Sequence, residues 1–213
     1  MSRAARTAIK TRHGTDAVPL GLAAYPKQDP RCIRRAFELG LNYFFFYGPG
    51  QTDFIGGLKP LLKRHRDDII VATGSGARKP YTLAAAKRKI CTAVGLDAVD
   101  VFFAEYVNPG DDDEAIFGAG RVLDELQQWK ADGLTRYVGA SVHDRALARR
   151  LAEDPRVDVL MHRFNMAHRK AADEVFPAAR KAGTPVIAFT ATRWRTLMAE
   201  REDYSGKLPT AAD

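Results

Sequence analysis

Short apolar runs alternate with longer amphipathic stretches along most of the chain. The short runs are rich in valine, isoleucine and phenylalanine and are apolar almost throughout, which is typical of parallel strands covered on both faces. About seven strands are expected, at residues 18–24, 41–46, 68–73, 99–104, 136–140, 157–161 and 185–189. In the longer stretches, apolar residues recur three and four positions apart, which indicates helices. The predicted helices span residues 30–39, 52–63, 82–94, 114–132, 144–153 and 170–182.

Glycines mark the ends of several predicted helices. Gly40, Gly95, Gly133 and Gly183 each follow a helix at the point where a left-handed residue would end it. Before the first strand, residues 13–16 can form a tight turn, so an N-terminal hairpin is expected at 7–17.

The alternation of strands and helices leaves two architectures, a doubly wound sheet and a TIM barrel. A doubly wound nucleotide-binding sheet usually carries a GxGxxG turn after its first strand, and residues 21–25 hold no such motif. We therefore predict an α/β fold, an incomplete TIM-type barrel of about seven parallel strands, as a single domain over 1–213. The stretch 195–213 is expected to be an irregular tail.

The net charge of +7 is compatible with a polyanionic partner or with an anionic cofactor. The basic residues are scattered over most predicted helices and aromatic residues do not interleave with them, so no nucleic-acid partner is expected. No apolar run approaches the roughly 18 residues of a membrane span, and the N-terminal segment lacks the apolar region of a secretory signal. These features predict a cytoplasmic protein without a membrane partner.

The two cysteines, Cys32 and Cys91, each fall inside a predicted helix, so neither a disulfide nor a cysteine metal site is expected. The five histidines do not share a helix face at metal-ligand spacing. No metal is predicted.

Several segments, taken in order, resemble the motifs of the aldo-keto reductase superfamily. They are GLNYFFFYGPGQTDFIG at 40–56, LDAVDVFFAE at 96–105, DGLTRYVGAS at 132–141, MHRFNMAHR at 161–169 and TPVIAFTATRW at 184–194. The resemblance implies a barrel whose active site lies at the C-terminal ends of the strands. It also implies transfer of hydride from NADPH to a carbonyl.

In that family a tyrosine acts as the general acid, and a lysine, an aspartate and a histidine tune its acidity. A phenol with an ordinary pKa near ~10 must become more acidic to donate its proton efficiently near neutral pH. The resemblance places the tyrosine at Tyr47, whereas Phe45 stands at the aspartate position, Gly74 at the lysine position and Glu105 at the histidine position. The candidate catalytic residues are Tyr47 and Glu105.

Glu105 admits two interpretations. In one steroid-reducing branch of the family a glutamate replaces the histidine, and its protonated carboxyl polarises an enone. Alternatively, Glu105 is a partly solvated residue at the barrel mouth that pairs with Arg163 or Arg193.

The resemblance also assigns candidate cofactor contacts. Ser141 matches a serine that holds the nicotinamide carboxamide, and Phe189 replaces a tyrosine that stacks on the ring. Thr190 and Arg193 occupy the stretch that cradles the pyrophosphate, and Arg193 is a plausible phosphate partner. The cofactor implied is NADPH, although Val142 and Met161 stand where the family has an asparagine and a glutamine.

Two functions follow from these residues. The first is an NAD(P)H-dependent oxidoreductase acting on a carbonyl or enone; the second is a non-catalytic pseudoenzyme that binds a small molecule or regulates. A barrel without an eighth strand would stay open between its first and seventh strands, and exposed strand edges need a cover. The tail from Arg195, a partner such as a second copy in a homo-oligomer, or a missing continuation of the sequence would supply it.

Overall fold

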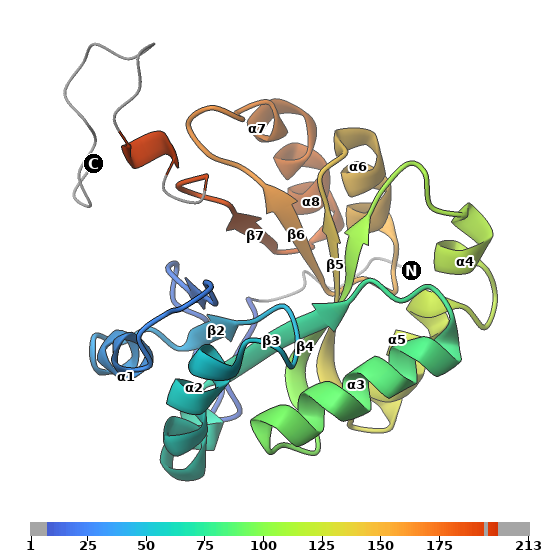
Figure 1. The fold of residues 1–213 in the computed structure, drawn as a ribbon. Helices are drawn as coiled ribbons and strands as arrows, with labels where there is room; N and C mark the ends of the chain where they lie inside the picture. The colour runs from blue at the N-terminus through green and yellow to red at the C-terminus, as the bar shows by residue number, and fades with distance from the viewer. Residues whose placement is uncertain (1–7, 194–195, 200–213) are drawn as a thin grey trace.

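The computed structural model describes residues 8–193 and 196–199. Its centre is one sheet of seven parallel strands in the order β1-β2-β3-β4-β5-β6-β7, which curls into a partial barrel with the helices outside (Figure 1). The strands are β1 (Leu22–Ala23), β2 (Tyr43–Phe45), β3 (Ile70–Ser75), β4 (Val99–Val107), β5 (Thr135–Val142), β6 (Val159–Arg163) and β7 (Val186–Phe189). The predicted incomplete TIM-type barrel is therefore confirmed.

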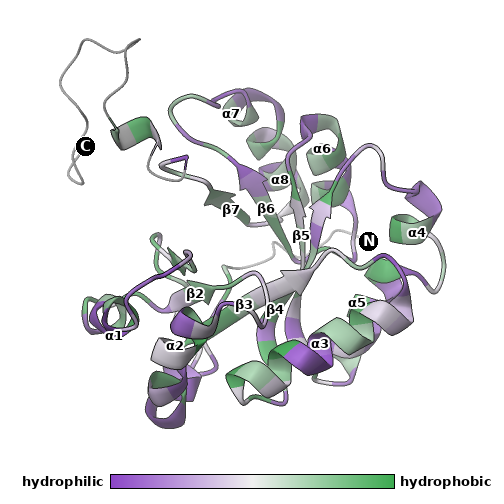
Figure 2. Cartoon of the chain, viewed as in Figure 1, coloured by the Kyte–Doolittle hydropathy of each residue, from purple (hydrophilic) through white to green (hydrophobic). Residues whose placement is uncertain are grey.

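Helices connect the strands, as the pattern of apolar residues predicts. They are α1 (Arg31–Glu38), α2 (Thr52–His65), α3 (Pro80–Val94), α4 (Asp113–Phe117), α5 (Val122–Ala131), α6 (Arg145–Glu153), α7 (Ala171–Glu174) and α8 (Phe176–Ala182), with 3-10 turns η1 (Arg66–Asp68) and η2 (Thr196–Met198). Hydrophilic residues gather on α1 and at the C-terminal end of α2, where Lys63, Arg64 and His65 form the last turn (Figure 2).

Two predicted helices were wrong in their continuity. The stretch 114–132 is divided into α4 and α5, because Gly118 is extended and Gly120 has a left-handed φ of 68°. The stretch 170–182 is divided into α7 and α8, and Pro177 starts the second of them because it lacks the N–H that a continuing helix would use.

The four helix-ending glycines behave as predicted. Gly40, Gly95, Gly133 and Gly183 have φ values of 92°, 77°, 73° and 69°, in the left-handed region that favours glycine.

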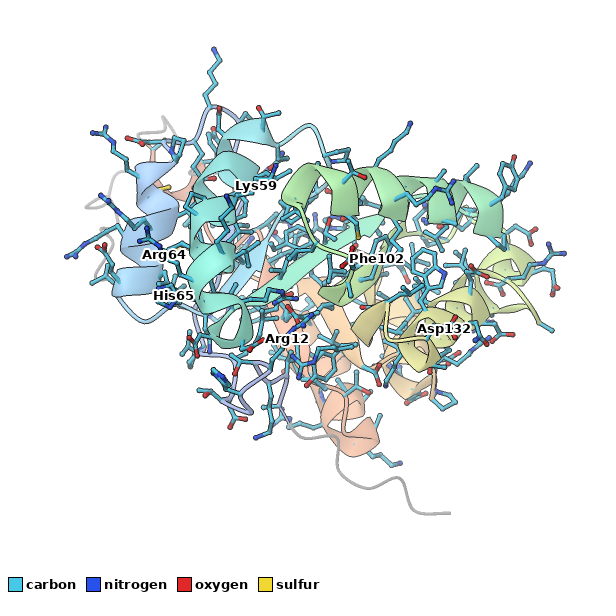
Figure 3. All side chains as sticks on the ribbon, turned by 90° about the horizontal axis from the view of Figure 1, so that it is seen from below. Arg12, Lys59, Arg64, His65, Phe102 and Asp132 are labelled. Atoms are coloured by element: carbon cyan, nitrogen blue, oxygen red, sulfur yellow. The ribbon has the colours of Figure 1, made fainter. Side chains whose placement is uncertain are left out.

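The sheet has two buried faces. Alternate strand residues, including Phe45, Val101 and Phe103, fill the interior of the barrel, while their neighbours pack under the helices. Phe102, for example, lies between β4 and the outer helices, with its ring edge-on to Trp129 of α5 at 5.2 Å (Figure 3). Strands buried on both faces explain the apolar runs of the sequence.

The N-terminal segment closes the lower end of the barrel, which is the end at which the strands begin. An antiparallel bridge joins Lys10 to Asp16 around a turn. This element is smaller than the predicted hairpin at 7–17, and residue 7 of that prediction lies outside the described residues. Arg12, seen from below in Figure 3, reaches the fully buried carboxylate of Asp100. The segment is thereby tied to the start of β4.

A groove of about 600 Å³ separates the two outer strands, β1 and β7. Tyr43, Phe45, Met161, Ile187 and Phe189 line its inner wall, so the barrel interior is reached from this flank. The predicted opening between the first and seventh strands is present in the described part of the chain. The predicted irregular tail at 195–213 falls mostly outside the described residues, and the homo-oligomer through this flank stays a prediction.

Within residues 8–193 and 196–199, no helix has the length and apolar character that crossing a membrane requires.

Candidate ligand site at the barrel mouth

A run of aromatic rings crosses the C-terminal ends of the strands. The ring of Tyr47, just after β2, stacks with that of Tyr106 at 6.4 Å between centroids. Tyr106 stacks with His143 at 6.1 Å, and His143 meets Phe189 of β7 edge-on at 5.0 Å. The structure thus brings Tyr47 and Phe189, both predicted from the sequence, to one mouth.

A bulge near the end of β4 positions two consecutive residues at this mouth. The register of β4 against β5 shifts between Ala104 and Val107, and Tyr106 has a left-handed φ of 53°. Left-handed backbone is rare for a bulky residue and often marks a functional position. Because a bulge breaks the alternation of side chains, the side chains of Glu105 and Tyr106 both lie at the mouth although the two residues are consecutive. The hydroxyl oxygen of Ser141 accepts the Tyr106 N–H at 2.9 Å and holds the bulge.

Glu105 is a buried carboxyl without a partner at one oxygen. Glu105 is only 5% exposed, and its Oε1 has no hydrogen-bond partner among the described residues. Burial raises its pKa to about 8, against a smaller lowering effect of the Arg78 guanidinium. The carboxyl is therefore mostly neutral at pH 7 and can both donate and accept a hydrogen bond.

The expected pairing of Glu105 with Arg163 or Arg193 is not found: no ion pair joins them within the described residues. The basic neighbour is Arg78, whose Nη2 donates to the main-chain oxygens of Glu105 and Tyr106 and to the Asp111 carboxylate. Sequence reasoning missed Arg78, because the short β3–α3 loop at residues 76–79 carries no motif that aims it at β4.

Gly74 is enclosed by β4. A Cβ at this position would lie 2.5 Å from the main-chain oxygen of Phe103 and 2.6 Å from Cγ of Glu105. Real Cβ atoms do not make such contacts, so the Glu105 side chain occupies the space that any side chain at 74 would need.

The phenol of Tyr47 is less acidic than usual. Burial raises its pKa to about 12, and the neighbouring Tyr106 and Glu105 add to the effect. Phe45 packs its ring edge against Tyr47 at 4.8 Å, in the barrel interior. An apolar ring at the aspartate position therefore gives the phenol no charged partner.

The remaining candidate residues lie in and after β5 and β7. Ser141 is buried and faces the mouth. Thr190 has a φ of 56°, its hydroxyl donates to the Phe189 carbonyl at 2.7 Å, and its carbonyl accepts from Asn165 at 2.9 Å. Arg193 is exposed in the turn that follows. These contacts organise the β7 loop.

A pocket of about 430 Å³ opens beside Tyr47, between the β2 and β3 loops and α3; we name it the mouth pocket. Glu105 lines it, and Lys89 of α3 lies at its side. Most of its remaining wall is made of small residues, namely Gly48, Gly74, Ser75, Gly76, Ala85 and Ala86.

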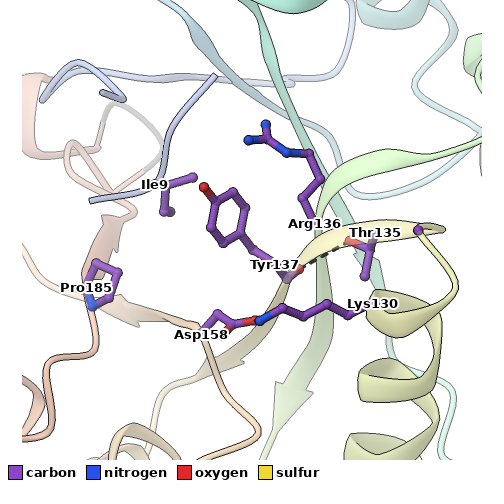
Figure 4. Close-up of a pocket in the computed structure, with 8 residues that line it drawn as sticks. Ile9, Lys130, Thr135, Arg136, Tyr137, Asp158 and Pro185 are labelled. Carbon is purple, nitrogen blue, oxygen red and sulfur yellow. Dashed lines mark hydrogen bonds and ion pairs between the residues drawn. The ribbon is translucent and has the colours of Figure 1, made fainter. Parts of the chain in front are cut away.

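Another hollow, of about 480 Å³, lies at the opposite end of the barrel (Figure 4). Its polar groups are engaged: Lys130 pairs with Asp158 at 2.7 Å, Arg136 donates to the carbonyls of Lys10 and Thr11, and the Tyr137 hydroxyl accepts the Lys10 N–H. This hollow offers a ligand few unmet polar atoms. Among the residues that the structure describes, no group of three or more His, Cys, Asp or Glu side chains is arranged to hold a metal ion.

The curled parallel sheet of seven strands, with helices between the strands, is the arrangement of an incomplete TIM-type barrel. The family model for the aldo/keto reductase family matches residues 24–207, so the chain belongs to that family.

Solved structures share this fold. An aldo-keto reductase from Bacillus halodurans in its holo form superposes with a TM-score of 0.69 at 19% identity, over 89% of this chain and 67% of that one. An aldo/keto reductase from Klebsiella pneumoniae in complex with NADP and acetate gives 0.69 at 14% identity, over 90% and 72%. Comparison with curated proteins gives no match.

Proposed function

We propose that this chain binds a small organic molecule at its barrel mouth and does not carry out hydride transfer through the tyrosine-centred site of its family. The observation that carries the proposal is the pair of residues at positions 74 and 105: Gly74 stands where the family has its lysine, and Glu105 stands where it has its histidine. A lysine at 74 would supply the cation that makes the phenol acidic, but the Glu105 side chain fills that space and brings an unpartnered carboxyl oxygen.

The state of Tyr47 supports this proposal. Its pKa rises to about 12, away from the value that proton donation near neutral pH favours. Each unit of pKa corresponds to about 1.4 kcal/mol. The family reaction through Tyr47 would therefore lose a sizeable part of its driving force.

The fit to NADPH is poor among the described residues. Val142 is fully buried in the outer core and Met161 packs in the barrel interior, so neither offers a polar group to a carboxamide. Ser141 already accepts the Tyr106 N–H, and Phe189 already contacts the His143 ring. The two family members named above are holo and NADP complexes, which makes cofactor binding the property to test.

The test is a fluorescence titration of the full chain with NADPH, beside an NADP-binding family member as a positive control. We expect no saturable binding at millimolar cofactor and no oxidation of NADPH with carbonyl or enone substrates. Micromolar binding with turnover would refute the proposal. A fragment screen by NMR, with amide shifts mapped to the mouth, tests the ligand-binding half independently.

A second candidate is an NAD(P)H-dependent oxidoreductase that uses Glu105 as its acid. One observation favours it: the pKa of Glu105 rises to about 8, so that the carboxyl is neutral and can donate a proton at pH 7. In that case enone reduction should persist in Tyr47→Phe and disappear in Glu105→Gln, which cannot release a proton.

A further inference from the structure

Buried polar atoms without hydrogen-bond partners lie at and beside the mouth pocket. Oε1 of Glu105 is buried and has no partner among the described residues, and Nε and Nη1 of Arg78 are in the same condition. Buried polar atoms without partners are costly, so natural proteins seldom keep them without a reason such as an unseen ligand. Glu105 differs from Arg78 in lining the pocket directly.

From this juxtaposition we propose that the mouth pocket binds a planar lactam or cyclic amide, a ring whose N–H and C=O stand side by side, paired edge to edge with the Glu105 carboxyl. The inference rests on the proposed function and names the chemical class of the ligand.

The chemistry of the carboxyl selects this class. A neutral carboxyl presents one O–H donor and one C=O acceptor in the same plane. A lactam edge satisfies both with two parallel hydrogen bonds, whereas an ether, a ketone or a carboxylate ligand supplies acceptors only and leaves the carbonyl oxygen of the carboxyl unmet.

The surrounding charges argue against an amine ligand. Arg78 acts on Glu105 from the β3–α3 loop, and Lys89 lines the pocket from α3. Both are cations, and a ligand ammonium would be repelled by them. The other titratable groups that face Glu105 are the phenols of Tyr47 and Tyr106, which interact with its charge.

The shape of the pocket favours a flat ring. Tyr47 lines the pocket, and the glycines and alanines among its other lining residues leave room for a ring. About 430 Å³ is enough for one or two fused rings. Stacking on Tyr47 would hold the ring while its edge meets Glu105.

The experiment compares two probes on the full chain by amide-detected NMR titration: 2-pyridone, which has the lactam edge, and 2-methoxypyridine, which has the same ring without the N–H. We expect 2-pyridone to shift amides around Gly74, Gly76 and Ala85 and to bind at least about tenfold more tightly. Equal affinities, no binding of 2-pyridone, or shifts confined to other regions would overturn the inference.

Two variants add a second measurement, the pH dependence of 2-pyridone affinity, which would not change if Glu105 had only a structural role. Glu105→Gln keeps a donor and an acceptor but does not ionise, so it should keep 2-pyridone binding at all pH values. The wild-type affinity should fall about tenfold per pH unit above the Glu105 pKa, because only the neutral carboxyl donates. Glu105→Leu should lose the preference for 2-pyridone, and if that variant does not fold, the contrasting pH profiles of wild type and Glu105→Gln decide.

The outcomes also separate this inference from the proposed function. A fragment of other chemistry that binds at the mouth, with no preference for 2-pyridone, would sink the lactam assignment and leave the proposed function standing. Tight NADPH binding with turnover would sink the proposed function, and the lactam assignment with it.

Discussion

Strand β4 carries two buried acidic residues, one near each end of the barrel, and their surroundings are opposite. Asp100 at the lower end is fully buried, with Oδ2 accepting from Arg66 at 2.7 Å and from the Val71 N–H at 2.8 Å. Its Oδ1 meets Arg136 at 3.3 Å and Arg12 at 3.4 Å. Glu105 at the mouth has no hydrogen bond from a described residue at Oε1 and forms no ion pair within that part of the chain.

The difference indicates that Asp100 stabilises the fold, whereas Glu105 is available to bind a ligand. A buried carboxylate surrounded by donors joins elements that are distant in sequence, here the N-terminal segment, β3, β4 and β5. A buried carboxyl without donors costs stability, since the charged form is desolvated and the neutral form lacks partners. Such a cost is tolerated where a ligand completes the hydrogen bonds.

The largest effect is expected from breaking the lower cluster. Asp100→Asn leaves Arg12, Arg66 and Arg136 without their shared anion, and removing one partner of a buried ion cluster typically costs roughly 3 to 5 kcal/mol. Urea unfolding of the variant measures this loss. The matched control is Asp16→Asn, which breaks an exposed pair with Lys10 and should cost less than about 1 kcal/mol. Equal losses in both variants would show that the cluster does not hold the lower end together.

A somewhat smaller effect, with the opposite sign, is expected at the mouth. The pKa of Glu105 rises from 4.5 to about 8 on folding, so the folded state holds its proton more tightly than the unfolded state. The contribution to stability is fully present below pH 4.5 and is lost as the pH rises through 8. Glu105→Gln has no such proton to lose, so it should gain roughly 2 to 4 kcal/mol over wild type between pH 4.5 and 8.5.

Denaturant unfolding of both proteins at these two pH values measures that gain. Glu38→Gln, on the exposed side of α1, is the control for general effects of charge removal. Parallel pH profiles for wild type and Glu105→Gln would mean that the carboxyl is solvated in solution and that the contrast with Asp100 does not exist.

The sequence predicts the barrel well because the relevant signals are local. Apolar runs with their periodicity define the strands and helices, and glycines such as Gly95 and Gly183 end helices through their backbone freedom alone. The failures are also local in origin. The break between α4 and α5 depends on backbone angles at Gly118 and Gly120, which apolar periodicity does not reveal.

The site is less predictable, because its character depends on contacts between strands. The family resemblance brought Tyr47 and Glu105 forward, and both line the mouth pocket. It did not bring forward Tyr106 or His143, whose rings connect Tyr47 to Phe189 only because a bulge reorients the chain. Nor could it tell that Glu105 would have Arg78 as its basic neighbour, since that contact joins the β3–α3 loop to strand β4.

The smallest expected effect tests how tightly β4 covers position 74. Gly74→Ala would force a Cβ to within 2.5 Å of the Phe103 main-chain oxygen and 2.6 Å of Glu105 Cγ, and overpacking of this kind costs roughly 1 to 3 kcal/mol. Two residues later on the same side of the pocket, a Cβ at Gly76 would meet nothing within 4 Å, so Gly76→Ala should be neutral or slightly stabilising, by up to about 1 kcal/mol. Thermal unfolding of the two variants measures the difference. Because Glu105 leans over Gly74, the first variant should also weaken 2-pyridone binding. If both alanines are tolerated alike, the space at 74 is free in solution and a lysine could enter it. The buried carboxyl of Glu105 would then not exclude a cation from this mouth.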